Sequence, residues 1–142
     1  MTIAQRRVAA ETVRTQPIAT SDDVVRARQL ARALAVECGL SLVEQTKLVT
    51  AASELARNTL VHGRGGRMDG EVVGRPGAHG VRLAFTDQGP GIPDTDLALR
   101  DGWSSGTGMG LGLSGARRLM DEFELDTAAG RGTTVTVVKW TR

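Results

Sequence analysis

The chain has 142 residues, of which 40% are hydrophobic and 24% charged, and its formal net charge is +2. This length suits one domain with a single core, and no apolar stretch approaches the roughly 20 residues that a membrane-spanning helix needs. The arginines are scattered and aromatic residues make up only 3%, so we expect no nucleic-acid-binding surface. A single cysteine, Cys38, excludes an internal disulfide and is compatible with a cytoplasmic location.

The start of the chain predicts a leader, an edge strand and a helix. Residues 1–14 are expected to form a flexible leader outside a domain that spans 15–142. A strand is predicted within residues 11–18, at the edge of a sheet, because its proline cannot donate to a strand ladder. Apolar residues then recur at helical spacing up to Cys38, which predicts an amphipathic helix with Ser21 as its N-cap.

A second helix is predicted between Ser41 and Gly63. The run Ser41-Leu42-Val43-Glu44 is a capping box that would open it. Glu54 and Asn58 lie four residues apart, so they share one helix face. Glu54 can accept a proton from a hydroxyl or a water, and Asn58 can offer a neutral oxygen to Mg²⁺, which needs few protein ligands when phosphates supply the others. The alternative is a solvated helix surface.

Two strands follow, and the second ends in an acidic residue next to glycines. Residues 67–73 predict the first strand, residues 74–80 a glycine-rich hairpin loop, and alternating apolar residues a second strand that ends at Asp87. Gly89 and Gly91 follow at once. A carboxylate beside backbone without Cβ atoms would let a flat ligand lie close and donate to it, as the exocyclic amine of a purine does. The alternative is a turn that only closes the strand.

A long polar segment and a run of alternate glycines come next. Residues 90–108 are rich in Pro, Gly, Asp and Ser, and a loop of this length is expected to act as a lid. The glycine run opens a helix predicted over residues 111–122, so free backbone N–H groups and the helix N-terminus would together cradle a phosphate. A flexible hinge is the alternative. The residues expected to bind phosphate are Gly106, Gly108, Met109, Gly110, Leu111 and Gly112.

Two short strands are predicted at the end of the chain. They lie near residues 124–128 and 133–140, around a turn at 130–132. Strands followed by a helix and then by more strands indicate an α+β fold. We expect a two-layer sandwich in which helices cover one face of a mixed sheet.

Three motifs taken together resemble the GHKL ATPase superfamily, which has the Bergerat nucleotide-binding fold. Residues 54–58 resemble its N box, residues 87–91 its G1 box and residues 108–113 its G2 box. The pair Gly132-Thr133 resembles the closing G-T element of that superfamily. The order and spacing of the motifs are far more specific than any one of them, and the resemblance covers about residues 15–142.

Within that superfamily the chain is most similar to the RsbT-type serine/threonine kinases of bacterial sigma-factor switches. The similarity rests on residues 52–58, 87–94 and 118–123 and on the pair Lys139-Trp140. It implies that ATP is the nucleotide and that a partner protein with a STAS domain, an antagonist, carries the serine or threonine that is phosphorylated. It also implies that the free kinase activates a phosphatase of the PP2C type by binding it.

The resemblance also implies a role for each motif. Adenine would bind at Asp87, through a water that Thr133 also holds, with Gly89 and Gly91 beside it. Asn58 would ligate Mg²⁺ and Glu54 would deprotonate the acceptor hydroxyl, since phosphoryl transfer is mostly positioning and charge stabilisation.

Other readings of the site remain. For His62, the two readings are contact with the phosphates and a structural role. For Arg100, they are contact with the phosphates and exposure to solvent. The main alternative function is a non-catalytic, nucleotide-dependent anti-sigma or adaptor module, and a third is a bare ATPase. Glu54 favours the kinase, because binding alone needs no base there.

Overall fold

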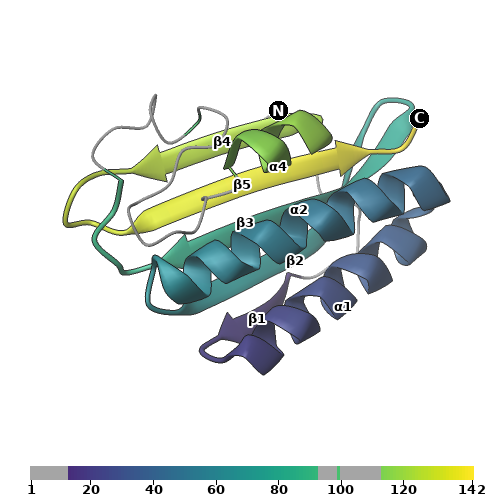
Figure 1. Cartoon of the computed structure of the whole chain (residues 1–142). Coiled ribbons are helices and arrows are strands. Elements are labelled where there is room, and N and C mark those ends of the chain that lie inside the picture. Colours follow the sequence, from purple (N-terminus) through teal and green to yellow (C-terminus); the bar gives the residue numbers. More distant parts are fainter. Residues whose placement is uncertain (1–12, 93–98, 100–112) are drawn as a thin grey trace.

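A computed structural model of the chain describes residues 13–92, 99 and 113–142. Figure 1 shows its helices lying on one side of a five-stranded sheet. In this part of the chain, no helix is long and apolar enough to span a membrane. The elements are, in order, β1 (Arg14–Ile18), α1 (Ser21–Cys38), α2 (Leu42–Val61), β2 (Gly66–Arg75), β3 (Ala78–Asp87), α4 (Leu113–Leu119), β4 (Glu122–Thr127) and β5 (Thr133–Trp140).

The sheet has the strand order β1-β2-β3-β5-β4, and each pair of neighbours is antiparallel. The α+β sandwich is confirmed, but the prediction of a mixed sheet is wrong. The connection through α4 does return the chain in the direction of β3, so β4 runs parallel to β3. β5 then folds back from β4 and inserts between them, which leaves the two parallel strands apart.

Helix α1 begins and ends through local backbone chemistry. Its N-cap is Thr20, one residue before the predicted Ser21, because the Thr20 hydroxyl accepts from the Asp23 N–H at 3.3 Å. The Asp23 carboxylate in turn accepts from the Thr20 N–H at 3.2 Å, which completes a capping box. Gly39 ends the helix as predicted, with a φ of 85° that a residue without a Cβ adopts at little cost.

Helix α2 keeps one half of its predicted capping box. The Ser41 hydroxyl accepts from the Glu44 N–H at 3.2 Å. The Glu44 side chain is buried, and its Oε2 lies 3.0 Å from Lys139 Nζ on β5. At the other end, the Asn58 carbonyl accepts from both the His62 and Gly63 N–H groups, at 2.9 and 3.1 Å, so the helix stops where predicted.

The β2–β3 hairpin is tighter than predicted. Arg75 pairs with Ala78, which leaves only Pro76 and Gly77 in the turn rather than a loop over residues 74–80. Gly77 has a φ of 78°, and proline followed by a left-handed glycine suits such a turn. The strands therefore extend further than their composition suggested.

The core lies between the helices and the sheet. Gly70 allows the close approach of α1, because a Cβ there would lie 2.6 Å from Leu34 Cδ1. The core includes alternate residues of β3 and β5 and the inward faces of α1 and α2, among them Val81, Leu83, Phe85, Val135, Val137, Ala31, Leu34, Leu48, Ala52 and Leu55. This packing holds α2 across the sheet, so that its last turn lies beside the end of β3, where Asp87 is.

Candidate functional site

A cavity of about 300 Å³ lies where α2 and β3 end and β5 begins. This size is in the range of small-molecule sites, and a mainly apolar wall with a few polar groups is typical of them. The structure brings the predicted Asn58, Asp87, Gly91 and Thr133 together around this space. The full lining is Leu55, Asn58, Thr59, His62, Gly63, Phe85, Asp87, Pro90, Gly91, Ile92, Leu113, Thr133 and Val135.

Asp87 is the acidic residue of the cavity. Its Oδ1 accepts from the Gly89 N–H at 2.9 Å, and the Thr133 N–H also donates to the carboxylate. Burial raises the pKa of Asp87 above its ordinary value of 3.8, while the two N–H groups oppose this rise. The result is a partly desolvated acceptor, held in place by the backbone, with its remaining lone pairs available to a ligand.

The glycines near Asp87 are also required by the packing of the protein itself. A Cβ on Gly89 would lie 2.8 Å from Gly63 Cα, and one on Gly91 would lie 2.0 Å from the Ala128 carbonyl oxygen. The protein's own backbone therefore lies where a Cβ would point at either position. Gly91 still lines the cavity, and Gly89 acts through its N–H group.

Gly63 is a site residue that sequence reasoning treated only as a helix stop. A Cβ at Gly63 would lie 2.3 Å from Asp87 Cγ, so no other residue fits between α2 and this carboxylate. The signal in the sequence was a glycine directly after the helix. That signal is shared by every helix that ends in glycine, and only the tertiary contact distinguishes this one.

Thr127 is a second residue that the sequence did not indicate. Its hydroxyl donates to the Gly132 carbonyl at 3.0 Å and accepts from the Ile92 N–H at 2.9 Å. Thr133 Oγ1 lies 2.8 Å from Thr127 Oγ1. Because the single Thr127 proton is used on Gly132, Thr133 must be the donor, and its own lone pairs remain available at the cavity wall.

The predicted pair Glu54 and Asn58 is divided between two environments. Asn58 lines the cavity, whereas Glu54, one turn earlier, is not among the lining residues. The Glu54 side chain is 42% exposed and its Oε1 lies 3.2 Å from Arg57 Nη1. His62 also lines the cavity, and burial lowers the pKa of its imidazole, so it is neutral at neutral pH.

Several predictions concern residues that lie outside the described part of the chain. These are the leader up to residue 12, most of the 90–108 segment with Arg100, and the phosphate-binding run of Gly106, Gly108, Met109, Gly110, Leu111 and Gly112. Leu113, the next residue, begins α4 and lines the cavity. Among the described residues, no group of three or more His, Cys, Asp or Glu side chains could hold a metal ion.

Comparisons with known proteins show what this chain is similar to in sequence and in fold. The serine/threonine-protein kinase RsbT of Bacillus subtilis (strain 168) is 46% identical over 125 residues, which cover 88% of this chain and 94% of that protein. The anti-sigma F factor of Clostridium beijerinckii is 27% identical over 127 residues, or 86% of this chain and 89% of that protein. A structure of the RsbU and RsbW domains of a Mycobacterium tuberculosis protein shares the fold, with a TM-score of 0.61 and 20% identity over 92% of this chain and 32% of that one.

The family described as the histidine kinase-like ATPase domain matches residues 18–139, which include every described residue that lines the cavity. This chain belongs to that family.

Proposed function

We propose that this chain is an ATP-dependent serine/threonine protein kinase of a bacterial partner-switching pathway that regulates a sigma factor. The carrying observation is the cavity of an ATPase-domain fold in which Asp87, Asn58 and Thr133 meet. The similarity to the kinase RsbT over nearly its whole length supports the choice of activity.

The cavity wall accounts for adenine binding. The Asp87 carboxylate would accept from the exocyclic amine, and the Thr133 hydroxyl would accept from the same group or from a water between them. Leu55, Phe85 and Val135 supply an apolar surface for the purine ring. Neutral His62 would add no charge to this wall.

Asn58 and Glu54 are proposed to serve the phosphate end. The Asn58 side-chain oxygen would be the one protein ligand of Mg²⁺, which fits a metal that takes most of its ligands from phosphates and water. When bound, Mg²⁺ neutralises the negative charge of the phosphates. Glu54 would accept the proton of the attacking hydroxyl. Its partial exposure leaves it open to a partner protein, and Arg57 orients its carboxylate.

The proposed acceptor is a serine or threonine of a STAS-domain antagonist. The kinase would also bind and activate a PP2C-type phosphatase, and both partners would be met in the cytoplasm. The similarity to an anti-sigma F factor favours a sigma-factor pathway. It also keeps a second candidate, a nucleotide-dependent binding module that transfers no phosphate.

Substitution of Glu54 tests the kinase activity. We expect Glu54→Gln to keep ATP affinity, measured by calorimetry, and to lower phosphotransfer by about 10²–10⁴-fold, the usual contribution of a general base. The assay incubates the chain with γ-labelled ATP and a STAS-domain protein from the same genome. Glu37→Gln, which alters an exposed carboxylate paired with Arg14, is the matched control and should transfer normally.

Three outcomes separate the candidate functions. Label on a serine or threonine of the partner supports the kinase. Label released only as inorganic phosphate indicates an ATPase, and stable binding of both nucleotide and partner without transfer indicates a binding module. Normal transfer by Glu54→Gln would remove Glu54 from the reaction.

A further inference from the structure

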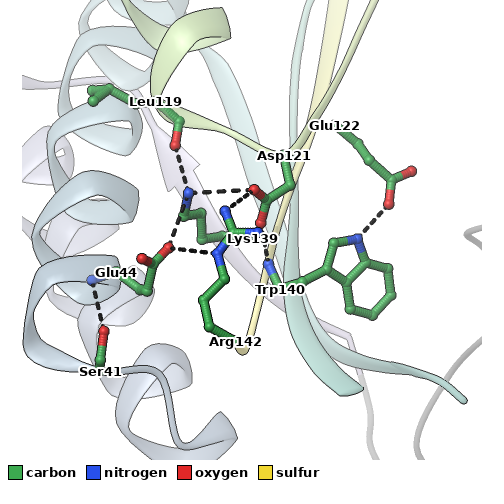
Figure 2. Close-up of polar contacts among 8 residues, drawn as sticks. All are labelled: Ser41, Glu44, Leu119, Asp121, Glu122, Lys139, Trp140 and Arg142. Carbon is green, nitrogen blue, oxygen red and sulfur yellow. Dashed lines mark hydrogen bonds and ion pairs between the residues drawn. The ribbon is translucent and has the colours of Figure 1, made fainter. Parts of the chain in front are cut away.

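A buried ion cluster lies away from the cavity, at the end of β5 (Figure 2). Its centre is Lys139, whose side chain is 3% exposed. The Lys139 ammonium donates to the Leu119 carbonyl at 3.0 Å, and it lies 3.0 Å from Glu44 Oε2 and 3.5 Å from Asp121 Oδ1. A cation at this carbonyl also suits the negative end of the α4 dipole.

The rest of the cluster balances its charge. Arg142 Nη2 donates to Asp121 Oδ1, and Arg142 Nε lies 3.8 Å from Glu44 Oε2. The Trp140 N–H donates to Asp121 Oδ2 at 2.7 Å. Burial raises the pKa of Asp121, but the Trp140 N–H, Lys139 and Arg142 together outweigh it, so that the pKa lies below its ordinary value. Two cations therefore face two carboxylates, and the lowered pKa keeps Asp121 ionised at neutral pH.

Lys139 joins the two helices that also form part of the cavity wall. Glu44 lies in the first turn of α2, and Leu55 of the same helix lines the cavity, about 16 Å further along the axis. Leu119 is the last residue of α4, and Leu113, its first residue, lines the cavity about 9 Å away along the axis. One ammonium group thus fixes both helices at the ends remote from the cavity.

We propose that Lys139 is a positioning residue for nucleotide binding, which holds α4 against α2 and so sets the place of Leu113 in the cavity wall. Without the ammonium, the Leu119 carbonyl loses its donor, and the end of α4, which this contact helps to hold, shifts relative to α2. Because packed interiors transmit such shifts rather than absorb them, the wall at Leu113 moves as well. The inference rests on the proposed function only in taking ATP as the ligand.

The test separates positioning from plain stability. Lys139→Met alone leaves Glu44 buried without its cation, so we expect a lower Tm as well as weaker ATP binding. In the double variant Lys139→Met, Glu44→Met the unpaired charge is gone, and Tm should recover most of its loss. ATP affinity should remain about tenfold weaker in both, because small displacements of binding groups are costly and the Leu119 carbonyl is still not held.

Each variant is measured by calorimetry with ATP, at a temperature where circular dichroism shows that it is folded. Arg14→Gln, which breaks an exposed ion pair with Glu37, is the control and should change neither Tm nor affinity. Normal ATP affinity in the double variant would overturn the positioning role of Lys139 and leave the proposed function intact. A wild-type chain that does not bind ATP would overturn both.

Discussion

At Asp87, the protonation state that favours folding differs from the one that ligand binding needs. Its carboxylate must leave water to face the cavity, and this burial raises its pKa. The folded protein therefore prefers the neutral acid more than the unfolded chain does. The proposed binding of an adenine amine, in contrast, needs the carboxylate as an acceptor.

The pH dependence of stability should report this conflict. The Asp87 carboxylate is protonated near pH 3.8 in the unfolded chain and at a higher pH in the folded chain. Between these two pH values, the folded state therefore binds more protons than the unfolded state does. The contribution of Asp87 to the free energy of unfolding is thus greatest below pH 3.8 and is lost as the pH rises through the folded-state pKa. Asp87→Asn lacks this term. In urea titrations, its stability relative to wild type should rise with pH over that window, and a difference that falls would contradict the raised pKa.

The same variant should bind ATP poorly. Loss of a hydrogen bond to a charged acceptor is worth about 1.5–3 kcal/mol, or roughly a tenfold to hundredfold weaker affinity by calorimetry. Unchanged affinity would move adenine away from Asp87.

At this scale, motif spacing was enough to predict that Asn58, Asp87 and Thr133 lie together, as they do around the cavity, because each stands at a fixed offset within a short motif. Thr127 and Gly63 were missed for a physical reason. Thr127 matters only because the β4–β5 register sets it opposite Thr133, and Gly63 only because the end of α2 meets Asp87. Both contacts join segments whose relative position no local pattern encodes.

At the scale of elements, two glycines that follow helices allow a matched comparison. Gly63→Ala places a Cβ 2.3 Å from Asp87 Cγ, so the end of α2 and the strand must move apart. In Gly39→Ala the added Cβ meets no atom within 4 Å, so the only cost to stability comes from the positive φ of 85°. We expect Gly39→Ala to cost about 1 kcal/mol and to leave ATP affinity unchanged.

Gly63→Ala is expected to destabilise the fold more than Gly39→Ala does, by up to about 3 kcal/mol as overpacked sites do, and to weaken ATP binding in calorimetry. If the two variants gave equal ATP affinities, the contact of α2 with Asp87 would have no part in the site.

The helices and the inward faces of the strands followed from local patterns, since periodicity and capping act over a few residues. The sheet order did not. A helix that connects two strands usually indicates that these strands are parallel neighbours. Here the β4–β5 hairpin instead places β5 between β4 and β3, because β5 carries apolar residues that are buried at this inner position. The two-residue turn at Gly77 was likewise not predicted. Gly74 and Gly80 suggested a longer loop, but both lie within the strands.

For the molecule as a whole, the helices and the sheet share one main core, and identical substitutions inside and outside it should differ sharply. Leu83 on β3 has no exposed surface, whereas Leu42 at the start of α2 is 72% exposed. Leu83→Ala should lower the free energy of unfolding by about 2–5 kcal/mol, from lost burial and the cavity that remains. Leu42→Ala should change it by less than about 0.5 kcal/mol. Urea unfolding of both variants checks the difference, and similar values would argue against a single cooperative core.

The strand order also bears on how copies of the chain behave when crowded together. One outer strand, β1, is short and contains Pro17, which cannot donate to a neighbour, and the other, β4, presents Glu122, Glu124 and Asp126 on one face. A second molecule that tried to extend the ladder would meet a missing donor on one side and repelling carboxylates on the other. The sheet is therefore built to terminate within one molecule, and it should resist amyloid-like aggregation even when the kinase is abundant.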